Sequence, residues 1–201
     1  MWPKLYSDQD FIRRFCFSCS TTKVLNAGSS DVRYGGDCTN VDIQEKEGVD
    51  YVCDIHDLPF RDNHFDIVVC NAVLQYCENP FQVARQFFRV LKPGGWLYVD
   101  APWMQPYCKD TPDKFRFSED GLKTVFKDFE IIEVGPSIQS GSAIAYMAFH
   151  MADSLTSNKY INHALAEMAR VVFFPIRYLK TLREQKTAGA FYLVGRKPIG
   201  E

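Results

Sequence analysis

The stretch FDIVVCNAVLQYCENPFQVARQFFRVLKPGGWLYVDA, residues 65–101, decides the fold of this chain. Its first and last six residues are largely apolar, as in strands that are covered on both faces. Between them, the apolar side chains of residues 80–91 recur at the spacing of one helix face. A strand–helix–strand unit connects through a right-handed crossover, so this stretch predicts two parallel strands in one sheet.

Short apolar runs bounded by turn residues extend the same pattern in both directions. They predict strands at residues 23–27, 39–43, 51–55, 65–70, 96–101, 129–135 and 190–196. Ser118 and the acids after it predict a helix start before the sixth run. The sequence therefore predicts an α/β protein with a Rossmann-like, mostly parallel, doubly wound sheet of seven strands.

The length of 201 residues predicts one domain, residues 1–201, large enough to bury about 70% of its unfolded surface. We expect a sheet core at residues 23–135 and 188–198 and a helical insertion at residues 136–187. The net charge of −2 argues against a general nucleic-acid binder, which needs a basic surface.

Seven cysteines, an odd number, and the absence of a secretory leader predict a reducing, cytoplasmic location. Cys16 and Cys19 have C-x2-C spacing, but no second pair follows at zinc-finger distance, so we expect no metal. No apolar run approaches the ~20 residues that cross a bilayer.

Polar residues stand where the first three strands end, and a doubly wound sheet binds ligands at that edge. Gly28 allows a tight turn and close approach to a ligand. Asp42, fourteen residues later, is placed to accept hydrogen bonds from a ribose diol, and Asp54 to receive an exocyclic amine. Each acid alone also fits a solvated strand end or a turn cap.

Two further stretches are more specific: L-P-F-x-D-x-x-F-D at residues 58–66 and L-K-P-G-G at residues 91–95. With the ordered residues Gly28, Asp42 and Asp54, they resemble the class I S-adenosylmethionine-dependent methyltransferases of the small-molecule branch, over about residues 23–101. The resemblance implies S-adenosyl-L-methionine as cofactor, methyl transfer as activity, and an antiparallel last strand with the helical insertion before it.

The resemblance also implies a set of cofactor residues. The turn at 26–29 would run past the methionine part, and residues 42–43 would take the ribose and one adenine face. Residues 54–55 would hold the adenine edge, and residues 71–72 would lie near the carboxylate and the sulfonium. The set is Asn26, Ala27, Gly28, Ser29, Asp42, Ile43, Asp54, Ile55, Asn71 and Ala72.

The first turn departs from the family pattern. Asn26 replaces an acid, and Ser30 replaces the second glycine. A neutral hydrogen bond to the cofactor's ammonium group is weaker than a charge-assisted one. A non-catalytic protein that uses this fold for binding or regulation is therefore the alternative. A nicotinamide-dependent dehydrogenase fits less well, because G-x-G-x-x-G is missing.

The methyl acceptor is expected at the loops after the fourth and fifth strands. Tyr76, Trp103, Tyr107 and Arg116 there suit a small polar acceptor such as a sugar or glycan hydroxyl. Residues 113–118 also resemble a stretch in relatives associated with sugar modification. In the other interpretation the loop aromatics pack beneath the loop and Arg116 pairs with a local acid.

A hydroxyl acceptor needs a base, since direct in-line displacement otherwise requires mainly proximity and alignment. His56 is the nearest histidine to the predicted site and has a suitable ordinary pKa. The residue types around it favour an ordinary loop residue over a base.

Residues 160–186 mix bulky apolar side chains with basic ones. Such a segment can make peripheral contact with a membrane, cover a substrate pocket or form the face of a homodimer. It can also pack on its own sheet.

Overall fold

The computed structural model describes residues 7–15, 22–29, 34, 37–109, 111–176 and 187–200. Its strands are β1 (Lys23–Ala27), β2 (Asp37–Asp42), β3 (Tyr51–Val52), β4 (Phe65–Asn71), β5 (Leu91–Pro102), β6 (Glu130–Ile138) and β7 (Ala190–Arg196). Its helices are α1 (Asp8–Phe15), the short 3-10 helix η1 (Leu74–Tyr76), α2 (Pro80–Val90), α3 (Glu119–Val125), α4 (Ser140–Ala152) and α5 (Lys159–Val172).

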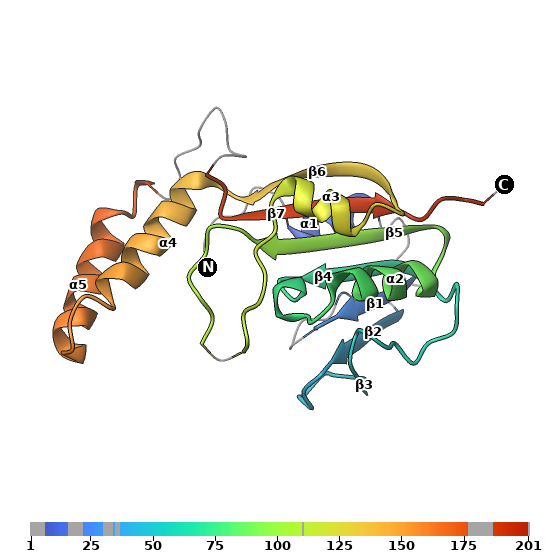
Figure 1. The fold of residues 1–201 in the computed structure, drawn as a ribbon, viewed down its shortest axis with the longest axis horizontal. Coiled ribbons are helices and arrows are strands. Elements are labelled where there is room, and N and C mark those ends of the chain that lie inside the picture. Colours follow the sequence, from blue (N-terminus) through green and yellow to red (C-terminus); the bar gives the residue numbers. More distant parts are fainter. Residues whose placement is uncertain are drawn as a thin grey trace.

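The seven strands form one sheet in the order β3-β2-β1-β4-β5-β7-β6 (Figure 1). β1 pairs in parallel with β2 and β4, and β4 with β5, whereas β7 runs antiparallel to both of its neighbours. The predicted fold class is therefore confirmed, including the antiparallel last strand.

Helices cover both faces of the sheet: α2 and α3 lie on one and α1 on the other (Figure 1). On β4, Val68 and Cys70 join the core beneath α2 and α3, while Ile67 and Val69 face α1. On the α1 face, Phe11 stacks on Tyr98 at 5.3 Å between ring centroids. The two-sided burial explains why β4 is an almost continuous apolar run.

Three strand boundaries differ from expectation by three residues or more. β3 has two residues and not five, because the His56 amide donates to the Asp54 carboxylate and turns the chain after the edge strand. β5 begins at Leu91, which pairs with Phe65 before residues 92–95 bulge out and Trp96 resumes the ladder. β6 continues to Ile138, past the expected start of the insertion.

The two insertion helices form an arm, defined here as residues 140–176. α4 and α5 pack against each other beyond one end of the sheet and on neither of its faces (Figure 1). The interpretation that residues 160–186 pack on their own sheet is therefore wrong for the part of that segment that α5 covers. Within the described ranges, every helix is too short or too polar to traverse a bilayer.

Candidate functional site

The carboxyl edge of the sheet carries a row of polar side chains on the α1 face. Because side chains on one face of a strand are two residues apart, these polar residues follow directly after the apolar residues that pack on α1. Asn26 on β1 is opposite Asn40 on β2, and Asn71 on β4 is opposite Asp100 on β5. Four adjacent strands thus present polar groups at the edge where such sheets bind ligands.

Gly28 in the first turn is required by packing. It has a φ of +75°, and its amide and that of Ser29 donate to the Val41 carbonyl at 2.9 and 3.0 Å. A Cβ at Gly28 would lie 2.3 Å from Cγ2 of Val73. The glycine therefore admits Val73 from the turn after β4, where we had expected space for a ligand.

The remaining residues of this turn differ in exposure. Asn26 is 2% exposed and donates to the Asn40 side chain at 3.3 Å, and the Ala27 side chain is fully buried. The hydroxyl of Ser29 is buried with no hydrogen-bond partner in the described part of the chain. An orphaned hydroxyl at the tip of β1 is a polar group that a ligand can satisfy.

Asp42 and Ile43 stand side by side at the end of β2. Asp42 is 8% exposed; it accepts the Gln44 amide at 2.9 Å and has Lys46 Nζ at 3.9 Å. Ile43 is 70% exposed, an unusual position for a large aliphatic side chain. A carboxylate beside an uncovered apolar surface suits a ribose carrying a flat base.

Asp54 and His56 form a pair after β3. His56 Nδ1 lies 2.6 Å from the Asp54 carboxylate, and its Nε2 accepts the Asn79 amide at 3.1 Å. Since Nε2 is an acceptor, the neutral ring carries its proton on Nδ1 and donates it to Asp54. Partial burial opposes ionisation of Asp54, but the hydrogen bonds from His56 outweigh it and lower the pKa of that carboxyl.

Both ring nitrogens of His56 are therefore engaged in holding the loop after β3 against the start of α2. This geometry favours the loop-residue interpretation over that of a general base. Asp54 keeps 54% of its side chain exposed and so presents a surface to a ligand. Ile55 differs, because its side chain belongs to the core beneath α2.

Asn71 and Ala72 lie at the tip of β4, as expected for residues beside a bound ligand. Ala72 is exposed and has a φ of +56°, a conformation that costs a non-glycine residue about 1–2 kcal/mol. Its amide donates to the Asp100 carbonyl, and its carbonyl accepts the Gln75 side chain, both at 2.8 Å. Strain of this kind gathers at functional sites.

Asp8, the first residue of α1, also reaches this edge. Its Oδ2 accepts the Asn71 side-chain amide at 2.7 Å and the Tyr34 hydroxyl. Burial, followed by the hydrogen bond to Asp8, raises the pKa of Tyr34. Our sequence reasoning missed Asp8, because the pattern around it indicates only a helix start, and 63 residues separate it from Asn71.

A cavity of about 140 Å³ lies beyond β5, between the following loop and the base of the arm. The Trp103 amide closes one side by donating to the Gly189 carbonyl at 2.9 Å. The lining is mostly apolar: Met104, Gln105, Ile138, Ser142, Ala143, Tyr146 and Gly189. The predicted acceptor side is thus built in part by α4.

The four predicted acceptor residues are absent from the described lining of this cavity. Trp103 and Tyr107 are 37% and 66% exposed, and Tyr76 is half-buried in η1. Arg116 forms a two-pronged ion pair with Asp113, and its hydrogen bonds lower the pKa of that carboxyl. The structure thus supports the interpretation that Arg116 pairs with a local acid.

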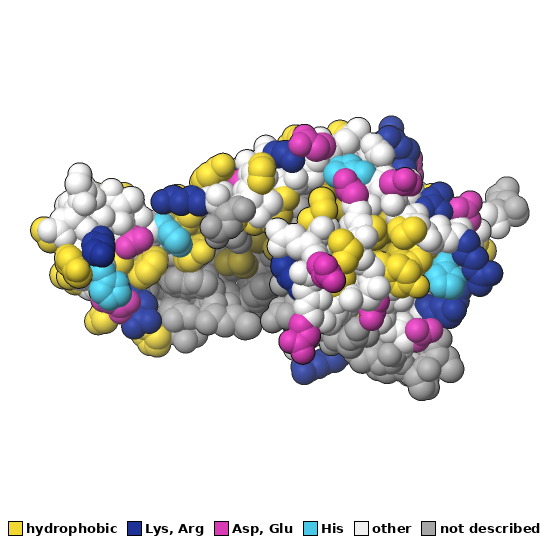
Figure 2. Space-filling model, turned by 90° about the horizontal axis from the view of Figure 1, so that it is seen from below, with side chains coloured by type: hydrophobic (Ala, Val, Ile, Leu, Met, Phe, Trp, Pro, Cys, Tyr) yellow, Lys and Arg dark blue, Asp and Glu magenta, His cyan; other side chains and the backbone are white. Residues whose placement is uncertain are grey.

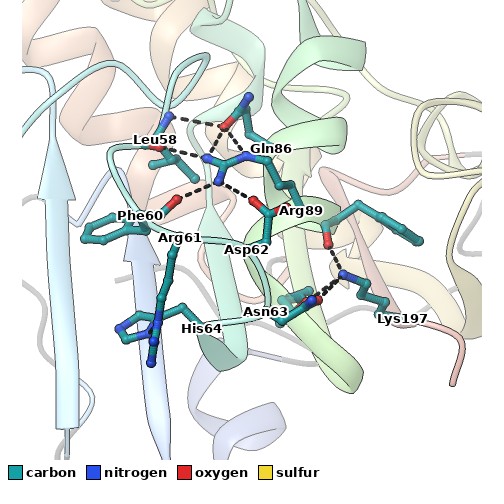
Figure 3. Close-up of polar contacts among 11 residues, drawn as sticks. Leu58, Phe60, Arg61, Asp62, Asn63, His64, Gln86, Arg89 and Lys197 are labelled. Carbon is teal, nitrogen blue, oxygen red and sulfur yellow. Dashed lines mark hydrogen bonds and ion pairs between the residues drawn. The ribbon is translucent and has the colours of Figure 1, made fainter. Parts of the chain in front are cut away.

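The most specific sequence motifs lie at the opposite, amino edge of the sheet (Figure 3). The Arg89 guanidinium donates to the carbonyls of Leu58 and Phe60 and to Asp62, and Lys197 donates to Asn63. A larger cavity, about 640 Å³, opens here. Because the side chains of Arg89 and Lys197 already donate to oxygens of the chain, we interpret this edge as structural and not as a ligand site.

No group of three or more His, Cys, Asp or Glu side chains suited to a metal ion occurs in the described ranges. Cys16, Cys19, Ser30 and residues 177–186 lie outside the described residues, so the structure tests none of the expectations for them.

Comparisons with known proteins agree with this architecture. Residues 18–99 match a family model described as "Methyltransferase domain". The ubiquinone/menaquinone biosynthesis C-methyltransferase of Vibrio cholerae is 33% identical over 89 residues, 43% of this chain and 32% of that protein. The chain covers less than a third of the length of the curated relatives it matches.

Solved structures share the fold at low identity. The [4+2]-cyclase SpnF superposes with a TM-score of 0.62 at 19% identity, covering 94% of this chain and 79% of that one. Geranyl diphosphate C-methyltransferase from Streptomyces coelicolor gives a TM-score of 0.60 at 12% identity, covering 94% and 78%. At such identities the likeness concerns the fold alone.

Proposed function

We propose that this chain transfers a methyl group from S-adenosyl-L-methionine to a small organic acceptor. The observation that carries the proposal is the cluster of buried Asp42, uncovered Ile43 and half-exposed Asp54 beside the first turn. The match of residues 18–99 to the methyltransferase domain supports it. So does the similar fold of a C-methyltransferase whose structure contains S-adenosyl-L-homocysteine.

The residues at the carboxyl edge fit the cofactor in most respects. Asp42 would accept the ribose hydroxyls, Ile43 would cover one adenine face, and Asp54 would receive the adenine amine. The orphaned Ser29 hydroxyl and the Asn71 side chain would meet the methionine part. When bound there, the cofactor supplies an electrophilic methyl group, and the chain contributes orientation.

The ammonium group of the cofactor needs an acid that the first turn does not provide, because Asn26 is buried against Asn40. Asp8 supplies a carboxylate at the same edge, 2.7 Å from the Asn71 amide. A carboxylate on α1 would thus replace the usual acid of β1 and restore a charge-assisted contact.

The acceptor would occupy the cavity between the loop after β5 and α4. Its mostly apolar lining favours an acceptor with an apolar body. The loop sequence favours a sugar or glycan hydroxyl, and the lining of the cavity supports that acceptor less well. Because both ring nitrogens of His56 are engaged in hydrogen bonds, we assign this residue no proton transfer. A cytoplasmic location and a homodimer stay predictions.

Calorimetric titration with S-adenosyl-L-homocysteine tests the cofactor half of the proposal. We expect binding by the wild type and a loss of about 10- to 100-fold in affinity for Asp42→Ala, since hydrogen bonds to a charged group contribute about 1.5–3 kcal/mol. Asp37→Ala, at the exposed start of the same strand, is the matched control. Folded wild type that fails to bind at millimolar ligand would contradict the proposal.

A non-catalytic role is the second candidate. The buried Asn26 in place of an acid favours it, and the fold also occurs in a [4+2]-cyclase. Folds of this kind host several activities, so the activity of this chain has to be argued from the residues of its site. If the folded protein does not bind S-adenosyl-L-homocysteine, the non-catalytic role replaces methyl transfer as the proposed function.

A further inference from the structure

Gln75 lies where the cofactor side and the acceptor side of the candidate site meet. It belongs to η1, which follows β4, and the parallel strands end on the side of the sheet that faces the arm, at the left of Figures 1 and 2. The Gln75 side chain donates to the Ala72 carbonyl at 2.8 Å. Its backbone carbonyl accepts the amides of Lys114 and Phe115 at 2.9 and 3.1 Å. Gln75 therefore joins the strained turn after β4 to the loop after β5.

The side-chain amide of Gln75 uses its nitrogen and leaves its oxygen without a partner. Gln75 is 3% exposed, and Oε1 accepts no hydrogen bond from the described part of the chain. Since the nitrogen has to face the Ala72 carbonyl, the orientation of the amide is fixed, and Oε1 is turned away from that carbonyl. Buried polar side-chain atoms normally have a partner, so this oxygen is suited to a group that a ligand supplies.

This oxygen lies close to the surface of the ligand edge. The oxygen and nitrogen of a side-chain amide are about 2.3 Å apart, so Oε1 is within about 5 Å of the carbonyl oxygen of the exposed residue Ala72. Burial, followed by a hydrogen bond with Cys108, raises the pKa of Tyr76, and a hydrogen bond from the Gln75 side chain opposes this rise. The amide thus lies between Ala72, expected near the sulfonium, and Tyr76, expected near the acceptor.

An amide oxygen accepts hydrogen bonds and attracts positive charge, but it has no proton to donate. The sulfonium of S-adenosyl-L-methionine is positively charged and polarises the C–H bonds of its methyl group, which makes them weak hydrogen-bond donors. The sulfur of S-adenosyl-L-homocysteine is neutral and carries no methyl group. Contacts with a charged group are stronger than contacts with a neutral one, and burial strengthens both. An oxygen at this position therefore favours the methyl donor over the product.

We propose that Oε1 of Gln75 contacts the sulfonium methyl group and selects S-adenosyl-L-methionine over S-adenosyl-L-homocysteine. This contact rests on the proposed function, since it needs the cofactor at the carboxyl edge of the sheet. It directs the methyl group toward the loop after β5, which the backbone of the same residue holds in place. The product lacks both the charge and the methyl group, so it is bound less tightly and leaves more readily.

Calorimetric titration of the full chain with both forms of the cofactor tests the contact. Gln75→Met keeps the length of the side chain and removes its amide. We expect the ratio of the affinity for S-adenosyl-L-methionine to that for S-adenosyl-L-homocysteine to fall about 5- to 10-fold in this variant. Gln86→Met, which removes a part-buried amide at the opposite edge of the sheet, is the matched control and should keep the wild-type ratio.

A second measurement on the wild type does not depend on the folding of a variant. With carbon-13 in the methyl group, the methyl proton resonance of bound S-adenosyl-L-methionine should lie downfield of that of the free cofactor, because the C–H bonds face an oxygen. An upfield or unshifted resonance would overturn the contact. So would equal losses of affinity for both ligands in Gln75→Met, which would assign Gln75 to holding Ala72 and leave the proposed function intact. Folded wild type that binds neither ligand would overturn both proposals.

Discussion

At the residue scale, Gly28 illustrates how one position serves the fold and the site together. Its left-handed backbone turns the chain at the tip of β1, and its missing Cβ makes room for Val73. This contact fixes the turn after β4, where Ala72 is held in a strained conformation. The glycine thus shapes the ligand edge through packing between two loops.

Gly28→Ala should destabilise the protein by roughly 2–4 kcal/mol, because a positive φ and a clash with Val73 add together. Gly48→Ala is the matched control: φ there is +85°, and nothing lies within 4 Å of an added Cβ. The control should cost about 1 kcal/mol from the backbone alone. Urea unfolding measures both, and equal losses would show that Val73 does not set the requirement.

The proposed contact of Asp8 with the ammonium group of the cofactor can be separated from its structural contacts by the choice of ligand. Asp8→Asn should weaken S-adenosyl-L-homocysteine binding by about tenfold, since a charge-assisted contact to the ammonium group becomes neutral. Adenosine, which lacks that group, should bind the variant and the wild type alike. Asp10→Asn, exposed on the same helix, is the control. An equal loss for both ligands would assign Asp8 a purely structural role.

At the scale of elements, the arm is an αα-hairpin with its own local supports. Asn162 on α5 closes the connection between the helices: it accepts the Thr156 amide and hydroxyl at 2.9 and 2.8 Å and donates to the Thr156 carbonyl at 2.8 Å. Few contacts tie either helix to the sheet. We therefore expect the arm to open independently of the core.

Asn162→Ala should speed amide hydrogen exchange in residues 153–165 and leave β4 and β5 unchanged. Three hydrogen bonds are lost, and the local opening free energy should fall by about 1–3 kcal/mol. His163→Ala, on the exposed charged face, should leave exchange as in the wild type. A uniform acceleration across the sheet would contradict the independence of the arm.

At the scale of the whole molecule, acid should destabilise the fold through paired carboxylates. Hydrogen bonds from Arg116 lower the pKa of Asp113, and those from His56 lower the pKa of Asp54 against its partial burial. A carboxyl whose pKa is lower in the folded protein than in the unfolded chain stabilises the fold. This stabilisation is complete above the unfolded pKa of 3.8 and is lost as the pH falls through the pKa of the folded state.

Asp113→Asn should therefore reduce the loss of stability between pH 5 and pH 2.5, while destabilising the protein by about 1–3 kcal/mol at pH 7. The Asp113 side chain is 2% exposed, whereas that of Asp120 is 94% exposed, so Asp120→Asn is the control. Urea midpoints across this pH range provide the measurement. An unchanged acid slope in Asp113→Asn would refute the assignment.

Expectation and structure agree best where the pattern is local. The sequence pattern predicts the seven strands and the α2 crossover because alternation and helical spacing report burial directly. Asp42, Asp54 and Asn71 were placed at the carboxyl edge for the same reason, since strand ends in a parallel sheet share an edge. Their contacts with a cofactor stay predictions.

The fold class, the order of the elements and the strand ends that form the candidate edge follow from the amino-acid sequence alone. Which side chains meet at that edge depends on how the elements pack. Asp8 reaches Asn71, Val73 fills the space at Gly28, and His56 is engaged on both ring nitrogens. The physical reason is range: periodicity arises from neighbours a few residues apart, whereas these contacts join segments that come together only when the helices pack on the sheet.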